Sequence, residues 1–382
     1  MLNNSLRSDH AIGVANIESS SVSFSVVTLQ SATSASIPIT RYAELPLEER
    51  TSGQHLFALK QRLADIAKAA LSDYAAKGGH SIKKMYAVIH APWALGSVVS
   101  ASMRLTKDTY ISEKIMSECA TKALSKSTKN AEFLDVHQLP IVLNGYRTQH
   151  PEGKYAHLVE VAGLMSTCDA TIREEIGKTF KEVSPASHTV IHSGARAVVE
   201  AIESARPDLS DAVCMHVSGE GTEIIVLRDG IVRSYTYIAE GLRTMLVRAF
   251  PGMRPEEARA AMRLLQKHEG SDVVGGQTED ALLNAEPEMA RAFGEGLAKI
   301  STQLRLPNKV FLIASPDIAP WLQKFFERLD FSQFTITAQP FSIDLISASD
   351  FGSITEEGAE RSGDLDVAIA TSHVLREEYP AA

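Results

Sequence analysis

A polar turn between two apolar stretches, at residues 216–223, carries residue types that can contact a phosphate group. Gly219 and Gly221 allow backbone N–H groups to approach anionic oxygens closely, and an acidic side chain can order magnesium and water. His216 is a poor magnesium ligand, however, because this ion prefers hard oxygen ligands. Glu220 also places negative charge among the glycines. These residue types allow a phosphate contact at the glycines but disfavour it at His216 and Glu220.

A second polar turn, near the N-terminus, has a similar form between the apolar stretches 12–17 and 22–27. Asn16 can coordinate a metal weakly through its amide oxygen, and the hydroxyl groups of Ser19 and Ser20 can donate hydrogen bonds. Glu18 would face a bound phosphate, and like charges about 4 Å apart in a partly screened site cost on the order of kcal/mol. We therefore interpret this segment as a plain polar turn.

A third candidate segment follows the apolar stretch 309–314. It reads Ala314-Ser315-Pro316-Asp317 and contains no glycine. Pro316 also lacks the backbone N–H group that a ligand could use. The segment is suited to begin a helix, and this is the role that we predict for it.

Two other pairs of residues could suggest chemistry. His188 and His192 lie on one face of a predicted strand, which is compatible with a metal site. No carboxylate or cysteine cluster is near them in the sequence, so ordinary polar surface is the better interpretation. Ser218 lies two positions after His216, but no third group orients the histidine as a hydrolase requires. The sequence predicts no catalytic residue and no metal site.

Composition limits the class of protein. The chain has 382 residues, a net charge of −9 and no basic stripe, which argues against nucleic-acid binding. Its three cysteines lie far apart in apolar stretches, as is typical of buried thiols in a reducing compartment. The first ten residues have no apolar segment, and no apolar stretch approaches the roughly 20 residues that span a bilayer. We expect a cytoplasmic protein.

Apolar spacing predicts alternating strands and helices along the whole chain. The predicted strands are 12–17, 22–27, 37–40, 85–90, 97–105, 132–138, 141–146, 156–167, 189–192, 213–217, 224–227, 231–237 and 309–314. The predicted helices are 56–74, 112–123, 169–181, 193–204, 241–250, one that begins at Pro255, 289–304, 320–329 and 365–378. Segments 269–279 and 354–364 are predicted to be loops. Residues 12–27 and 213–227 share the order strand, polar turn, strand.

The order of these features resembles the actin-like bacterial proteins FtsA, of the division ring, and PilM, of the type IV pilus machinery. Residues 12–27 stand where that family has its first phosphate hairpin, and residues 211–248 resemble the second hairpin and the helix after it. Residues 133–168, with the turn Pro151-Glu152-Gly153, resemble the subdomain inserted in FtsA. Residues 310–322 resemble the strand and helix of the adenosine site.

The resemblance implies an α/β fold of the actin-like ATPase (ribonuclease H-like) type, with two lobes and an inserted SHS2-type α+β subdomain. The expected parts are 10–84 and 182–206 for the first lobe, 85–181 for the insertion, 207–364 for the second lobe with a helical subdomain at 241–300, and 365–378 for a closing helix.

The resemblance also implies a vestigial nucleotide site. The second family motif, Asp-Ile-Gly-Gly-Gly-Thr-Thr-Asp, has His216 at its first aspartate and matches or nearly matches at Gly219, Thr222 and Glu223. The first motif, Asp-x-Gly-Thr-Ser-Lys, falls on Asn16, Glu18, Ser19 and Ser20. In the third, Ala314 and Ser315 stand at glycine positions. Three impaired motifs predict a pseudo-ATPase with no ATP or magnesium cofactor.

The resemblance also implies that the chain is a scaffold that binds partner proteins. The first hypothesis is an FtsA-like division protein that binds an FtsZ-like tail and associates with itself through residues 85–181. The alternatives are a PilM-like component that docks on the cytoplasmic tail of a pilus membrane protein, and an ATP-binding actin-like ATPase with weakened turnover. A sugar or acetate kinase would need a catalytic acid in one hairpin. The acidic end at 376–382 does not suit an amphipathic membrane helix, so we expect a partner to provide any contact with the membrane.

Overall fold

The structure, a computed structural model, describes residues 10–45, 52–125, 132–137, 140–148, 150–267, 273–352, 354–356 and 364–380. Parts of three predicted elements lie outside these residues. They are the strand end at Gln138, residues 269–272 of the loop predicted at 269–279, and residues 357–363 of the loop predicted at 354–364. The chain divides into two compact units. The first contains residues 1–93, 169–207 and 346–382, and the second contains residues 94–168 and 208–345.

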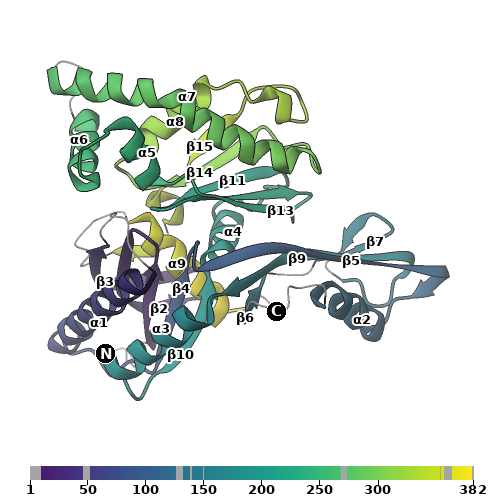
Figure 1. Cartoon of the computed structure of the whole chain (residues 1–382). Helices are drawn as coiled ribbons and strands as arrows, with labels where there is room; N and C mark the ends of the chain where they lie inside the picture. The colour runs from purple at the N-terminus through teal and green to yellow at the C-terminus, as the bar shows by residue number, and fades with distance from the viewer. Residues whose placement is uncertain are drawn as a thin grey trace, which may run out of the picture. The chain divides into compact units, whose positions relative to one another are not determined.

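The first unit is built on a six-stranded sheet in the order β10-β4-β1-β2-β3-β16. Its strands are β1 (His10–Ile17), β2 (Ser21–Ser31), β3 (Ser34–Glu44), β4 (Lys84–Ile89), β10 (His188–Ser193) and β16 (Ile354–Glu356). Its helices are α1 (Ser52–Ala76), α3 (Ala170–Val183), α4 (Gly194–Ala205), the 3-10 turn η2 (Ala348–Phe351) and α9 (Leu365–Glu378). Helix α1 packs on β2, β3 and α3, while α9 packs on α4 and β1 (Figure 1).

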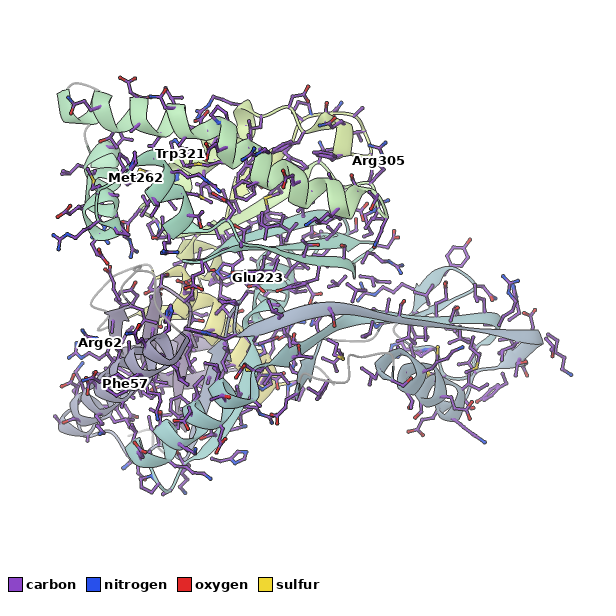
Figure 2. All side chains as sticks on the ribbon, viewed as in Figure 1. Phe57, Arg62, Glu223, Met262, Arg305 and Trp321 are labelled. Carbon is purple, nitrogen blue, oxygen red and sulfur yellow. The ribbon has the colours of Figure 1, made fainter. Side chains whose placement is uncertain are left out.

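The second unit contains a five-stranded sheet in the order β13-β12-β11-β14-β15. Its strands are β11 (Ala212–Val217), β12 (Thr222–Arg228), β13 (Ile231–Ile238), β14 (Lys309–Ala314) and β15 (Ser342–Leu345). Its helices are α5 (Leu242–Ala249), α6 (Pro255–Lys267), α7 (Val273–Ser301), α8 (Ala319–Arg328) and the 3-10 turn η1 (Ser332–Phe334). Between α7 and α8 the core is aromatic, with the ring of Phe293 packed on that of Phe326. The ring of Trp321, which Figure 2 labels, stacks on that of Phe325 with the centroids 5.2 Å apart.

The two sheets repeat one topology. In each, an antiparallel meander of three strands is followed by two parallel strands that are added on the other side of its first strand. The order β10-β4-β1-β2-β3 of the first unit thus corresponds to β15-β14-β11-β12-β13 of the second. The similarity between the hairpins at 12–27 and 213–227 therefore extends to five strands of each unit.

Residues 94–168 form a separate α+β module with its own sheet. Its elements are β5 (Ala94–Tyr110), α2 (Glu113–Leu124), β6 (Glu132–Val136), β7 (Ile141–Leu143), β8 (Tyr146–Thr148) and β9 (Tyr155–Cys168). The sheet order is β5-β9-β7-β8, with β6 also paired to β9, and α2 packs on β5 and β9. We call residues 94–168 the insertion.

Three sequence-based boundaries differ from the structure. The insertion was expected at 85–181, but β4 pairs with β1 and α3 packs on α1, so both belong to the first unit. The second lobe was expected to reach residue 364, but β16 pairs with β3. The loop predicted at 269–279 was wrong from Val273 onward, because α7 begins there. Among the described residues, no helix is long and apolar enough to cross a membrane.

Candidate functional site

The first candidate turn is buried and is held by contacts within the first unit. Strands β1 and β2 pair with Asn16 opposite Ser23, and the N–H group of Glu18 donates to the carbonyl of Ser21 at 2.9 Å. The N–H group of Leu45 donates to the carbonyl of Ser20 at 2.8 Å. Each of these turn residues is at most 7% exposed. The turn is thus packed into the core of the chain.

Two histidines that the sequence analysis did not single out contact this turn. Nε2 of His90, which follows β4, lies 2.8 Å from Oδ1 of Asn16. Nε2 of His55, on α1, lies 3.1 Å from the carbonyl oxygen of Ser19 and donates to it. The amide oxygen of Asn16 is the group that could coordinate a metal, and in this structure it accepts from a histidine. His90 directly follows a strongly apolar strand, and this was the only signal in the sequence that it would be buried.

The second candidate turn is closed by the beginning of helix α5. The N–H groups of Leu242 and Arg243 donate at 2.9 Å to the carbonyl oxygens of Ser218 and Gly219. The first N–H groups of a helix have no partner inside the helix and commonly bind anions. Here two of these donors are used by the turn itself. The hydroxyl of Thr222 donates to the carbonyl of Glu240 at 2.6 Å, which fastens the other side of the turn.

Gly241 makes this close approach possible. A Cβ atom at Gly241 would lie 2.3 Å from the backbone nitrogen of Gly221 and 2.8 Å from the carbonyl oxygen of Ser218. Real Cβ atoms are not found so close to backbone atoms, so a side chain at this position would push the turn and the helix apart.

His216 does not face an open site. It is paired in register with Glu223 across β11 and β12, and its Nδ1 lies 3.2 Å from Oε2 of that glutamate. The hydroxyl of Tyr235, on β13, donates to the other carboxylate oxygen, Oε1, at 2.7 Å. Burial and the neighbouring Glu223 raise the pKa of Tyr235 well above its usual value. Both oxygens of Glu223 are therefore engaged inside the second unit, where Figure 2 labels this residue.

The third candidate segment, after β14, is filled by charged side chains of the protein. Oδ2 of Asp317 accepts from Nε of Arg259 at 2.7 Å, and Oδ1 accepts from Nε of Arg263 at 2.9 Å. Arg259 also donates to the hydroxyl of Ser315 at 3.3 Å. Burial acts to raise the pKa of Asp317, but its hydrogen bonds and the charges of the two arginines hold that pKa below its usual value. The segment at 314–317 is therefore part of an ion-pair cluster within the second unit.

Sequence position alone could not indicate these arginines. Arg259 lies on α6, 58 positions before Asp317, and the side chain of Arg259 is only 8% exposed. Within the second unit, the structure does place the third segment beside the second hairpin, because Val217 of β11 pairs with Ala314 of β14. Asn16 lies near the end of β1, and Glu18, Ser19 and Ser20 form the turn between β1 and β2 of the first unit.

The expectation that His188 and His192 form ordinary polar surface was wrong for His192. His188 is exposed at the start of β10, whereas His192 is buried and forms part of a polar cluster with residues of α4 and α9. The two histidines differ in burial because of their positions on β10. His188 is the exposed first residue of this strand, which then runs inward beside β4 to His192.

The polar cluster of the first unit joins α9 to β10 and α4. Nδ1 of His373 lies 2.7 Å from Oε2 of Glu200, and the rings of His373 and His192 pack with their centroids 4.8 Å apart. Arg196 forms ion pairs with Glu200 and Glu377, and its Nη1 lies 3.2 Å from Nδ1 of His192. His192, His373 and Glu377 are close enough to share a metal ion. Arg196 already places a positive charge between the two carboxylates, so we interpret the cluster as an ion-pair network.

Comparison with known proteins agrees with the fold. No protein-family model matches the sequence, and no curated protein sequence is similar to it. The structure is similar to that of the PilM-PilN type IV pilus biogenesis complex, with a TM-score of 0.60 and 13% identity over 96% of this chain and 98% of the other. The ethanolamine utilization protein EutJ from Carboxydothermus hydrogenoformans gives a TM-score of 0.43 with 12% identity over 87% and 83%. The similarity to the PilM-PilN complex is one of fold, and the chain has the predicted actin-like ATPase fold.

Proposed function

We propose that this chain is a non-catalytic actin-like scaffold that binds a partner protein and does not turn over ATP. The observation that carries the proposal is the ion-pair cluster of Asp317 with Arg259 and Arg263, because it fills the loop expected to receive a nucleoside. The contacts of His90 with Asn16 and of the α5 N–H groups with the second turn support it at the other two motifs.

The role that we propose for the chain is in type IV pilus assembly, where it binds the cytoplasmic segment of a membrane protein. The likeness to the PilM-PilN complex supports this choice, since it covers almost the whole length of both chains. The division role, which the sequence analysis put first, rests on the resemblance to FtsA alone. The chain would then reach the inner face of the membrane through its partner.

Two binding experiments test the proposal. Isothermal titration of the chain with ATP and magnesium is expected to show no saturable binding, and saturable magnesium-dependent binding would instead support the weakened ATPase. Fluorescence anisotropy then compares two labelled peptides from the same organism: the cytoplasmic segment of its pilus-assembly membrane protein and its FtsZ tail. We expect binding of the first only, and binding of the FtsZ tail alone would favour the division role.

A further inference from the structure

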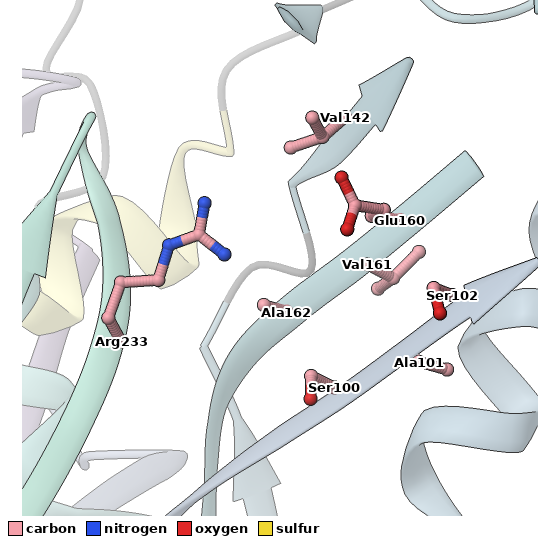
Figure 3. Close-up of a pocket in the computed structure, with 8 residues that line it drawn as sticks. All are labelled: Ser100, Ala101, Ser102, Val142, Glu160, Val161, Ala162 and Arg233. Atoms are coloured by element: carbon pink, nitrogen blue, oxygen red, sulfur yellow. The ribbon is translucent and has the colours of Figure 1, made fainter. Parts of the chain in front are cut away.

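The second unit contains a small polar cavity between β13 and one face of the insertion sheet (Figure 3). It has a volume of about 210 Å³, which is the room taken by roughly seven water molecules in the liquid. Serines of β5, Glu160 and two small apolar residues of β9, Val142 of β7 and Arg233 of β13 line it. We call it the β13 cavity.

The register of the insertion sheet builds the floor of the cavity. Ser102 of β5 and Val142 of β7 both lie opposite Glu160 of β9, so the three residues form one row across the sheet. The next row places Ser100 beside Ala162. Successive residues of a strand point to opposite faces, so the intervening residues pack into the core beneath α2. One face of this sheet is therefore a core, and the other lines the cavity.

Strand β13 crosses this face and is fixed on both sides of the cavity. Ile231 packs with Val142 and Ala162. Four residues further along, the ring of Tyr235 lies so close to Gly96 that a Cβ atom there would be 2.7 Å from it. Arg233 lies midway between these two contacts. Two fixed points hold the strand over the cavity and leave room beneath its centre.

The cavity contains two opposite charges that do not meet. The guanidinium of Arg233 and the carboxylate of Glu160 enter it from facing walls (Figure 3). Within the described part of the chain, neither side chain forms an ion pair or a hydrogen bond. An arginine fork and a carboxylate bind most strongly to groups of opposite charge, through charge-assisted hydrogen bonds. The cavity is therefore complementary to a ligand that carries both a negative and a positive group.

We propose that the β13 cavity docks an extended peptide of a partner protein, which presents an acidic group to Arg233 and a basic group to Glu160. Ser102, which also lines the cavity, offers a hydroxyl group to the peptide backbone. This inference rests on the proposed function, since it names the surface that the partner uses.

The first test uses the full chain and the labelled cytoplasmic segment of the pilus-assembly membrane protein. Charge reversal by Glu160→Lys or Arg233→Glu is expected to weaken binding at least tenfold. Glu118→Lys and Lys114→Glu are matched controls, because both residues are exposed on α2, which packs on the opposite face of the sheet. If all four variants bind equally well, the cavity is not the docking surface, although the scaffold function stands. If a reversal variant fails to fold by circular dichroism, Glu160→Gln and Arg233→Gln replace it.

The second test does not depend on that partner. Capped pentapeptides Ser-Asp-Val-Lys-Ser and Ser-Lys-Val-Asp-Ser are titrated into the full chain while the methyl signals of Ala162 and Val142 are followed by NMR. We expect one order of charges to shift both signals, and the matching Asn/Gln peptide to leave them unchanged. If the membrane-protein segment does not bind the unaltered chain, the proposed partner is wrong. The pentapeptide titration alone then shows whether the cavity binds a charged peptide. Unshifted signals with both charged peptides would overturn the inference.

Discussion

His216 and Glu223 lie opposite each other across β11 and β12, with Nδ1 of the histidine 3.2 Å from Oε2 of the glutamate. Their side chains are each 2% exposed. A carboxylate as well buried as that of Glu223 is stabilised by hydrogen-bond donors. The hydroxyl of Tyr235 is a second donor beside His216. The position that the actin-like resemblance assigns to a magnesium-ordering aspartate is thus occupied by a residue that supports the core of the second unit.

Restoring the acid at this position is expected to destabilise the protein and to leave it inactive. His216→Asp would place a second buried carboxylate beside Glu223, with a cost of about 2–4 kcal/mol in the free energy of unfolding. Urea unfolding at pH 7 measures this loss, and part of it should return at pH 5, where one carboxylate can take up a proton. His188→Asp, at an exposed position, should change stability by less than about 0.5 kcal/mol. A gain of magnesium-dependent ATP hydrolysis in His216→Asp would show that the site needs only an acid at position 216, and would contradict the interpretation that the protein's own side chains block it.

Removal of the charge on Asp317 should destabilise the second unit. Asp317→Asn keeps the shape of the side chain but leaves Arg259 buried without its carboxylate, at a cost of about 2–3 kcal/mol. Because the folded pKa of Asp317 is lowered, its contribution is present above the unfolded pKa of about 3.9 and is lost as the pH falls through the folded pKa. Thermal unfolding at pH 7 checks the loss. Asp208→Asn, at an exposed position, is the control, and an equal effect of both changes would argue against the cluster.

Stability should fall as the pH drops from 7.5 to 5.5, in part because of His373. Burial lowers the pKa of His373, and the charges of His192 and Arg196 lower it further, against the opposing effect of Glu200. The unfolded chain therefore takes up a proton first, and stability is lost as the pH falls through the unfolded pKa of about 6.5. Urea midpoints at several pH values should show a smaller slope for His373→Gln than for the unaltered chain. His188→Gln should keep the original slope.

Two glycine-to-alanine changes should have opposite effects. At Gly241 the new methyl group would meet the backbone of the second turn, so we expect a loss of about 2–3 kcal/mol or a failure to fold. At Gly177, on α3, nothing lies within 4 Å of the new atom, and alanine is expected to stabilise the helix by about 0.5–1 kcal/mol. Differential scanning calorimetry of both variants measures the contrast. A tolerated Gly241→Ala would show that α5 does not approach the turn as closely as the structure has it.

Local spacing was enough to predict most elements of the fold, but not the sheet or unit to which each element belongs. The alternation at 12–17 and 22–27 predicts a hairpin, and β1 and β2 form it. That β4 belongs to the first sheet is decided by its pairing with β1, about 70 positions away in the sequence, and no local pattern contains this information. The beginning of α7 was missed because Gly275 and Gly276 have low helix propensity, although the helix includes both.

The candidate site, like the fold, could be predicted from the sequence only in part. The changed residue types at His216, Glu18 and Pro316 predict an impaired nucleotide site from composition alone. What occupies the positions could not be predicted, since the partners His90, Tyr235 and Arg259 come from other strands and helices. The motif predicts which chemistry is impaired, whereas the packing shows which side chains contact these positions.

The two ends of the insertion meet. Ala94 pairs with Cys168 in antiparallel register, and the N–H group of Asp169 donates to the carbonyl of Trp93 at 3.1 Å. In genetic terms the insertion is a cassette, because we expect that residues 95–167 can be replaced by a short Asn-Gly turn without redirecting β4 or α3. Only the face of β13 that the insertion covers would become exposed. A single recombination event could therefore remove or replace the proposed docking cavity while the sequence of the rest of the chain stays the same.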